Sequence, residues 1–117
     1  MPISYRINQD EKLIQAKFEG EITLEQLTDY NRNLRDDPRF HTDLRELVEL
    51  ALIQPKLDFQ QLEAYTDWFS KLEPIRFTAI VATTPATFGM ARQFQTLAAR
   101  GQRRIEIFRD LAEAKAW

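Results

Sequence analysis

The chain of 117 residues has no cysteine, only three glycines and a single histidine. Because cysteine is missing, the chain has no disulfide, no thiolate metal ligand and no cysteine nucleophile. It also lacks the glycine-rich phosphate loops and the G-x-S-x-G turn that mark many nucleotide-binding proteins and hydrolases. The one histidine, His41, falls in an expected loop and has no metal-ligand motif around it. We therefore expect a protein that is not an enzyme, with no metal site and no cofactor.

Long apolar segments are missing as well. No apolar run approaches the ~20 residues that a membrane-spanning helix needs. The first residues show no basic segment followed by an apolar stretch, so they do not form a secretory signal, and we expect a cytoplasmic location. Hydrophobic residues make up 44% of the chain and charged residues 29%, which is ordinary for a globular protein. The length suits a single domain over residues 1–117.

Charge is unevenly distributed along the chain, although the net charge is only −2. Residues 1–75 are predominantly acidic, whereas residues 76–109 contain six arginines against Glu106 alone. Such asymmetry can indicate an anionic partner. It can equally mean that the two halves neutralise each other within one small domain. Because nothing in the chain resembles a nucleic-acid-binding module, we favour the second interpretation and expect no nucleic-acid partner.

Apolar patterns predict five strands. The first two are separated by the turn-forming segment 8–11 and therefore form an antiparallel hairpin. The segment 76–83 is nearly continuous in apolar and β-branched residues, as expected of a central strand that is covered on both faces. The predicted strands are 3–8, 13–20, 47–53, 76–83 and 104–109.

Four helices are predicted from residue types that cap helix starts. Thr23 and Asp58 are each followed three residues later by glutamine, the spacing of a capping box. Thr84 suits an N-cap because Pro85 follows at the first helical position. Asp110 begins a short last helix, and Gly101 suits the residue after the third one. The predicted apolar stripes are Leu24, Leu27, Tyr30 or Asn31, and Leu34; Phe59, Leu62, Tyr65, Phe69 and Leu72; and Phe88, Ala91, Phe94 and Ala98.

The resulting element order, β-β-α-β-α-β-α-β-α, indicates the α/β class. Helices between consecutive strands favour right-handed crossovers and hence parallel pairing. We therefore expect a mostly parallel five-stranded sheet with one antiparallel hairpin strand, covered by about four helices.

Several stretches resemble the STAS-like domains. They are PISYRI at 2–7, FEGEITLEQL at 18–27, AIVATTPATFGMARQF at 79–94 and EIFRDLAEAKAW at 106–117. The chain is most similar to short, stand-alone bacterial proteins with the SpoIIAA-like, anti-sigma-factor-antagonist fold, which is shared with the lipid-binding CRAL-TRIO superfamily. The resemblance implies a non-enzymatic regulatory or protein-interaction module. The CRAL-TRIO relation implies the alternative, a protein that binds a small apolar ligand, a lipid or an anion.

Partner-switching STAS domains carry a phosphorylatable serine at the start of the helix after the third strand. Here the corresponding segment, QPKLDFQQL at 54–62, has no serine or threonine. The resemblance therefore implies no phosphorylation site in this protein. Asp58 stands at the helix start, where it is either a permanent negative charge in place of the phosphate or simply a helix cap. The second interpretation is favoured because aspartate is a good N-cap and suits the helix dipole.

Two groups of residues are candidates for binding. Thr83, Thr84 and Thr87 lie where a parallel strand ends and a helix begins, which is the common place for a ligand or anion; the same residues also suit a purely structural corner. Tyr65 and Trp68 lie three apart on the second crossover helix. They predict an interaction surface for a protein partner or a homodimer, or else the margin of the core.

Overall fold

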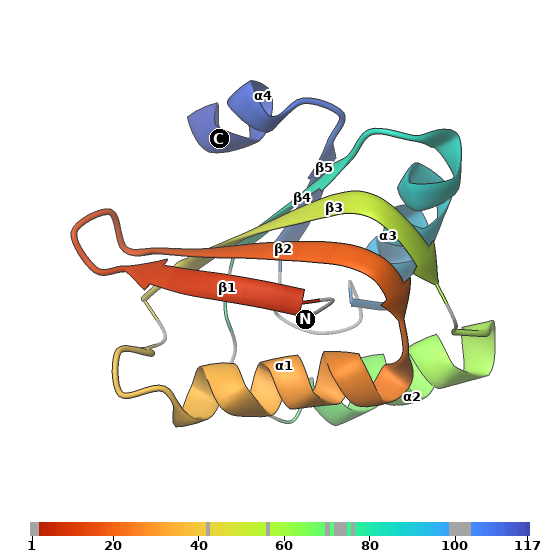
Figure 1. Ribbon diagram of the computed structural model, residues 1–117, viewed down its shortest axis with the longest axis horizontal. Helices are drawn as coiled ribbons and strands as arrows, with labels where there is room; N and C mark the ends of the chain where they lie inside the picture. Colours follow the sequence, from red (N-terminus) through yellow and green to blue (C-terminus); the bar gives the residue numbers. More distant parts are fainter. Residues whose placement is uncertain are drawn as a thin grey trace.

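A five-stranded mixed sheet organises the chain in this computed structural model (Figure 1), which describes residues 3–41, 43–55, 57–69, 71, 75, 77–98 and 104–117. Of residues 52–55 and 69 it describes the backbone alone. The strand order follows the sequence, from β1 to β5. β1 and β2 pair antiparallel, and all later neighbours pair parallel. The strands are β1 (Ile3–Asn8), β2 (Leu13–Ile22), β3 (Arg45–Pro55), β4 (Phe77–Ala82) and β5 (Arg104–Phe108).

Four helices complete the predicted order, which confirms the α/β class. Their bounds are α1 (Leu24–Asp36), α2 (Phe59–Phe69), α3 (Pro85–Ala98) and α4 (Leu111–Ala116). The expected caps form: Thr23 and Gln26 make a reciprocal capping box, Asp58 and Gln61 make another, and Asp110 accepts two backbone N–H groups. None of the described helices is long and apolar enough to cross a membrane. The proposed glycine cap at Gly101 lies outside the described residues.

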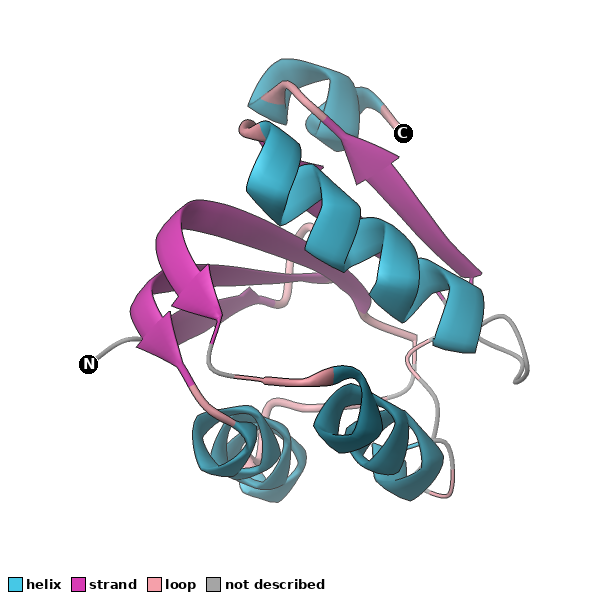
Figure 2. Ribbon diagram, turned by 90° about the vertical axis from the view of Figure 1, so that its right-hand side faces the viewer, coloured by secondary structure: helices cyan, strands magenta, loops and turns pink. Residues whose placement is uncertain are grey.

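The helices divide between the two faces of the sheet (Figure 2). α1, α2 and α3 pack on one face and enclose the larger core, whereas α4 packs on the other face. β4 is therefore covered on both sides, as its continuous apolar sequence predicts, with Ile80 in the larger core and Ala79 and Val81 in the smaller. Along β3 the side chains alternate in the same way, since Val48 belongs to the larger core and Leu47 to the smaller.

Two strands extend beyond their predicted ends. β2 continues past Gly20 to Ile22 because Gly20 adopts a positive φ of 72°, where the pairing with β3 shifts register after Phe18. A left-handed glycine in the strand lets the chain bulge and then resume pairing. β3 begins at Arg45, two residues before the predicted start. This extension brings Glu46 into the sheet.

One predicted core residue is exposed. Phe59 was placed on the apolar stripe of α2, but it is 53% exposed, whereas Leu62, Tyr65 and Thr66 are buried. Phe59 is the first residue of α2. Helical side chains lean toward the N-terminus, so a side chain in the first turn reaches past the helix rather than onto its packing face. The predicted Leu72 and the side chain of Phe69 lie outside the described residues.

Candidate ligand-binding site

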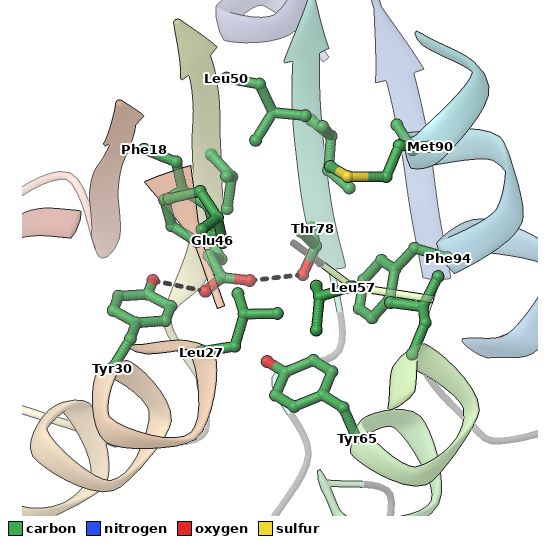
Figure 3. Close-up of a pocket in the computed structure, with 15 residues that line it drawn as sticks. Phe18, Leu27, Tyr30, Glu46, Leu50, Leu57, Tyr65, Thr78, Met90 and Phe94 are labelled. Atoms are coloured by element: carbon green, nitrogen blue, oxygen red, sulfur yellow. Dashed lines mark hydrogen bonds between the residues drawn. The ribbon is translucent and has the colours of Figure 1, made fainter. Parts of the chain in front are cut away.

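A pocket of about 70 Å³ lies between the sheet and helices α1, α2 and α3. Its walls come from the three strands β2, β3 and β4 and from the same three helices, so the pocket is a product of the tertiary fold. Most of the lining is apolar, and Figure 3 shows the labelled side chains converging on a common space. The lining residues are Phe18, Ile22, Leu27, Tyr30, Glu46, Val48, Leu50, Leu57, Leu62, Tyr65, Thr78, Ile80, Met90, Ala91 and Phe94.

A carboxyl group stands among these apolar walls. Glu46 is only 3% exposed. Its Oε2 accepts a hydrogen bond of 2.6 Å from the hydroxyl of Tyr30, and its Oε1 accepts one of 3.0 Å from Oγ1 of Thr78 (Figure 3). Tyr30 and Thr78 are themselves 5% and 1% exposed. The three side chains, here called the Glu46 cluster, form a buried polar group in contact with the pocket.

The strand register explains how the Glu46 cluster forms. Glu46 on β3 lies directly beside Thr78 on the parallel neighbour β4, so both side chains point to the same face of the sheet. Tyr30 reaches Glu46 from α1. Its ring is fixed by edge-to-face contacts with Phe18 and Tyr5, whose ring centroids lie 5.4 and 5.8 Å away. The hydroxyl is therefore held toward the sheet by packing as well as by its hydrogen bond.

Burying a carboxyl group in apolar surroundings is unfavourable unless hydrogen bonds compensate for the lost water. The hydroxyls of Tyr30 and Thr78 supply part of that compensation. A site of this kind can accept hydrogen bonds at the carboxyl oxygens and can donate or accept them at the hydroxyls. Among the described residues, no group of three or more His, Asp and Glu side chains is arranged to hold a metal ion.

A second polar chain runs along the helical side of the pocket. The hydroxyl of Tyr65, from α2, accepts a hydrogen bond from the Nδ2 of Asn31, from α1. The Oδ1 of Asn31 in turn accepts one of 2.7 Å from Arg35. These bonds tie α1 to α2 directly beneath the pocket, so they fix the position of Tyr65 in its lining.

Tyr65 is therefore buried, at 6% exposed, and not on the expected interaction surface. Its hydroxyl is hydrogen-bonded to Asn31 inside the protein, and the centroid of its ring lies 6.1 Å from that of Phe94. Both the polar and the apolar part of the side chain therefore have partners in the core. Trp68 is only partly buried and packs at the core margin, with the guanidinium of Arg32 5.6 Å from its ring centroid. Tyr65 therefore lies in the core, whereas Trp68 is the one of the two that reaches the surface.

Two of the three threonines at the start of α3, Thr84 and Thr87, are used by the fold. The hydroxyls of Thr84 and Thr87 lie 2.8 Å apart, and each accepts a bond of 3.2 Å from the backbone N–H of the other. Because Pro85 has no N–H, this pairing leaves few donors of the first turn for an anion. Thr83 is exposed. The arrangement favours the structural interpretation of this corner over the ligand-binding one.

Asp58 likewise acts as a helix cap. Its Oδ1 accepts a bond of 2.8 Å from the backbone N–H of Gln61, and the Gln61 side chain accepts from the backbone N–H of Asp58. His41 is exposed, and its backbone carbonyl accepts from the N–H of Leu44. Neither side chain lines the pocket.

A separate carboxylate has a clearly shifted pKa. The side chain and the backbone N–H of Arg39 donate hydrogen bonds to Asp37 and hold its pKa well below the ordinary 3.8, with a further bond of 3.0 Å from Tyr5. Burial raises the pKa of Tyr5, and its bond to Asp37 adds to the effect. The three residues lie away from the pocket lining and join β1 to the end of α1.

Sequence reasoning missed Glu46 because the predicted strand began one residue after it. A signal was present: a strand starting at Arg45 places Glu46 on the same face as Val48 and Leu50, where a charged residue interrupts an apolar row. Thr78 lay inside a predicted strand, but no pattern in a single sequence shows which strand lies beside it.

No protein-family model matches the chain, and no curated protein matches it significantly. Among solved structures, the chain is similar to an uncharacterised DUF3478 family protein from Shewanella loihica PV-4, described as having a SpoIIAA-like fold. The two share 15% sequence identity over 98% of this chain and 92% of the other, with a TM-score of 0.66. At this identity the likeness concerns the fold, and it agrees with the resemblance in the sequence. The protein therefore has a SpoIIAA-like fold.

Proposed function

We propose that the protein is a non-enzymatic binding module whose pocket takes a small, mainly apolar molecule with one hydrogen-bonding end. The observation that carries the proposal is the position of Glu46, 3% exposed, in a pocket whose remaining walls are largely apolar. Small-molecule sites combine walls of this kind with a few convergent polar groups that fix orientation. The proposal therefore follows the apolar-ligand alternative that the sequence resemblance implies.

The pocket volume limits the size of the ligand. An apolar cavity of about 150 Å³ accepts benzene, so a pocket of about 70 Å³ takes a smaller molecule unless side chains move. Met90, on α3, is the lining residue best suited to move, because its unbranched side chain changes rotamer easily. A long-chain lipid would need far more of the core to open, which close packing opposes. We therefore expect a short aliphatic molecule rather than a whole lipid.

The Glu46 cluster defines the polar end of that molecule. Carboxyl oxygens accept hydrogen bonds, so the matching group on the ligand is a donor such as a hydroxyl or an amine. An apolar molecule of the same shape without a donor would contact the same walls but would make no hydrogen bond to Glu46. A preference for an alcohol over its hydrocarbon analogue is therefore part of the proposal.

A regulatory or protein-interaction role is a second candidate. It is favoured by two large hydrophobic side chains that are exposed in the described part of the chain, Phe59 at 53% and Phe77 at 40%. Exposed aromatic residues are common at protein interfaces. The two roles are compatible, since a module can bind a small molecule in its core and a partner on its surface.

Native mass spectrometry of the protein purified from its own host tests the ligand proposal. Ala91→Leu adds bulk to the pocket wall, whereas Ala86→Leu makes the same change at an exposed position of the same helix. We expect a bound small molecule on the wild type and on Ala86→Leu, and none on folded Ala91→Leu. A wild type without bound mass, or equal retention by both variants, would contradict the proposal.

A further inference from the structure

A second hollow lies on the opposite face of the sheet from the pocket described above. It lies beside α4, has a volume of about 100 Å³ and is lined mainly by aliphatic and aromatic side chains with two cations at its margin. The aliphatic part comes from Leu13, Leu47, Ala79 and Ala114, and the margin from Arg45, Lys115 and Trp117. Glu46, which is only 3% exposed, also belongs to the lining.

Arginines and aromatic rings alternate next to this hollow. The guanidinium of Arg45 lies 5.9 Å from the ring centroid of Phe77, and that of Arg104 lies 5.8 Å from the ring of Trp117. The two rings meet edge to face, with centroids 6.1 Å apart. Contacts of this kind hold the guanidinium groups in place. One N–H of each is already used within the protein, because Nη1 of Arg45 donates to the backbone oxygen of Trp117 and Nε of Arg104 donates to Glu106.

These alternating arginine and aromatic side chains remain accessible to solvent. Phe77 is 40% exposed, and the side chain of Arg104 is 63% exposed. Glu106 contacts Arg104 at 3.5 Å, and the buried Glu46 belongs to the lining of the hollow. The cations of Arg45, Arg104 and Lys115 outnumber these two carboxyl groups.

We propose that this surface, formed by Arg45, Phe77, Arg104, Lys115 and Trp117, docks an acidic peptide segment of a partner protein. In this arrangement an aliphatic side chain of the partner enters the hollow beside Trp117. Aspartate or glutamate residues next to it pair with the guanidinium groups of Arg45 and Arg104. The inference goes beyond the ligand proposal and does not depend on it.

Charge complementarity and ring geometry favour a peptide over a nucleic acid. Single strands bind through open ring faces on which bases stack. Here the rings of Phe77 and Trp117 each have an arginine stacked on them, and they meet each other edge to face. The hollow, in addition, is suited to an aliphatic side chain rather than to a flat base.

Fluorescence polarisation with the labelled peptide EDLEED and the full chain tests the proposal. We expect saturable binding that weakens with added salt and falls about tenfold when the leucine of the peptide becomes serine. The variant Arg45→Glu/Arg104→Glu should also weaken binding at least about tenfold, equivalent to about 1.4 kcal/mol. The matched control, Arg6→Glu/Arg92→Glu, makes the same change of charge at exposed positions outside the surface and should leave the affinity within about twofold.

Three results would overturn the inference. One is equal loss of affinity in the two double variants, which would indicate net charge alone. Another is tighter binding of a labelled oligothymidine than of the peptide. The third is sedimentation showing that the wild type dimerises through this surface and that Arg45→Glu/Arg104→Glu is a monomer.

Discussion

Replacing Tyr30 by phenylalanine should destabilise the protein by about 1–3 kcal/mol, the range for losing a hydrogen bond to a buried polar or charged group. The substitution removes only the hydroxyl that donates the 2.6 Å bond to Glu46. The ring contacts with Phe18 and Tyr5 do not involve the hydroxyl and should persist. The loss therefore reports the hydrogen bond, because almost no apolar surface is removed.

Urea unfolding followed by tryptophan fluorescence measures this change. The slope of the unfolding free energy against urea should match that of the wild type, and the midpoint should fall. Tyr5→Phe is the matched control, since its hydroxyl also bonds a carboxylate, Asp37, but at a partly exposed site where water can replace it. The control should lose less stability than Tyr30→Phe.

A double-mutant cycle with Glu46→Gln measures the interaction free energy between Tyr30 and Glu46, apart from the other effects of each substitution. If the Tyr30 hydroxyl acts through the carboxyl group of Glu46, the two substitutions should couple by about 0.5–3 kcal/mol. A loss below about 0.5 kcal/mol for Tyr30→Phe, the size of an ordinary surface substitution, would refute the assignment of a compensated buried carboxyl group.

Three further perturbations address other parts of the account. Thr84→Ala should lower the free energy of unfolding by about 1 kcal/mol through loss of the helix cap, measured by urea unfolding, while leaving the effect of added sulfate on stability unchanged. Asp37 has a folded pKa below its ordinary 3.8, so its stabilising contribution is present above that value and is lost as the pH falls. Asp37→Asn should therefore reduce the loss of stability between neutral pH and about pH 3 seen in urea titrations; an unchanged pH profile would count against the Arg39 contact. Gly20→Ala should cost about 1 kcal/mol in the same assay, because φ is 72° and no heavy atom lies within 4 Å of an added Cβ, so the penalty is conformational.

The element order and the helix caps could be predicted because they depend on local chemistry. Thr23 with Gln26, and Asp58 with Gln61, satisfy backbone groups within four residues, so their spacing alone identifies the helix start. The strand between Phe77 and Ala82 was equally clear, since burial on both faces requires a continuous apolar run.

The site depends on contacts that no local pattern contains. Glu46 meets Tyr30 across 16 positions and Thr78 across 32, through strand register and helix packing. The spacing of Tyr65 and Trp68 predicts an interaction surface, but the polar partner of Tyr65, Asn31, lies on another helix, so the sequence does not distinguish a buried tyrosine from an exposed one. Phe59 fits the helical periodicity of α2 but is exposed, because the pattern does not show that a side chain in the first turn reaches past the packing face.

The proposed function rests on a pocket that accepts a small molecule with a polar end at Glu46. Methyl NMR titration with isopropanol tests this most directly, with isobutane, in which a methyl group replaces the hydroxyl, at equal concentration as the comparison. The account predicts saturable shifts confined to the pocket methyl groups of Leu57, Leu62, Met90 and Ala91, and tighter binding of the alcohol than of the hydrocarbon. Shifts that rise linearly and spread over the surface, or equal affinity for both molecules, would contradict it.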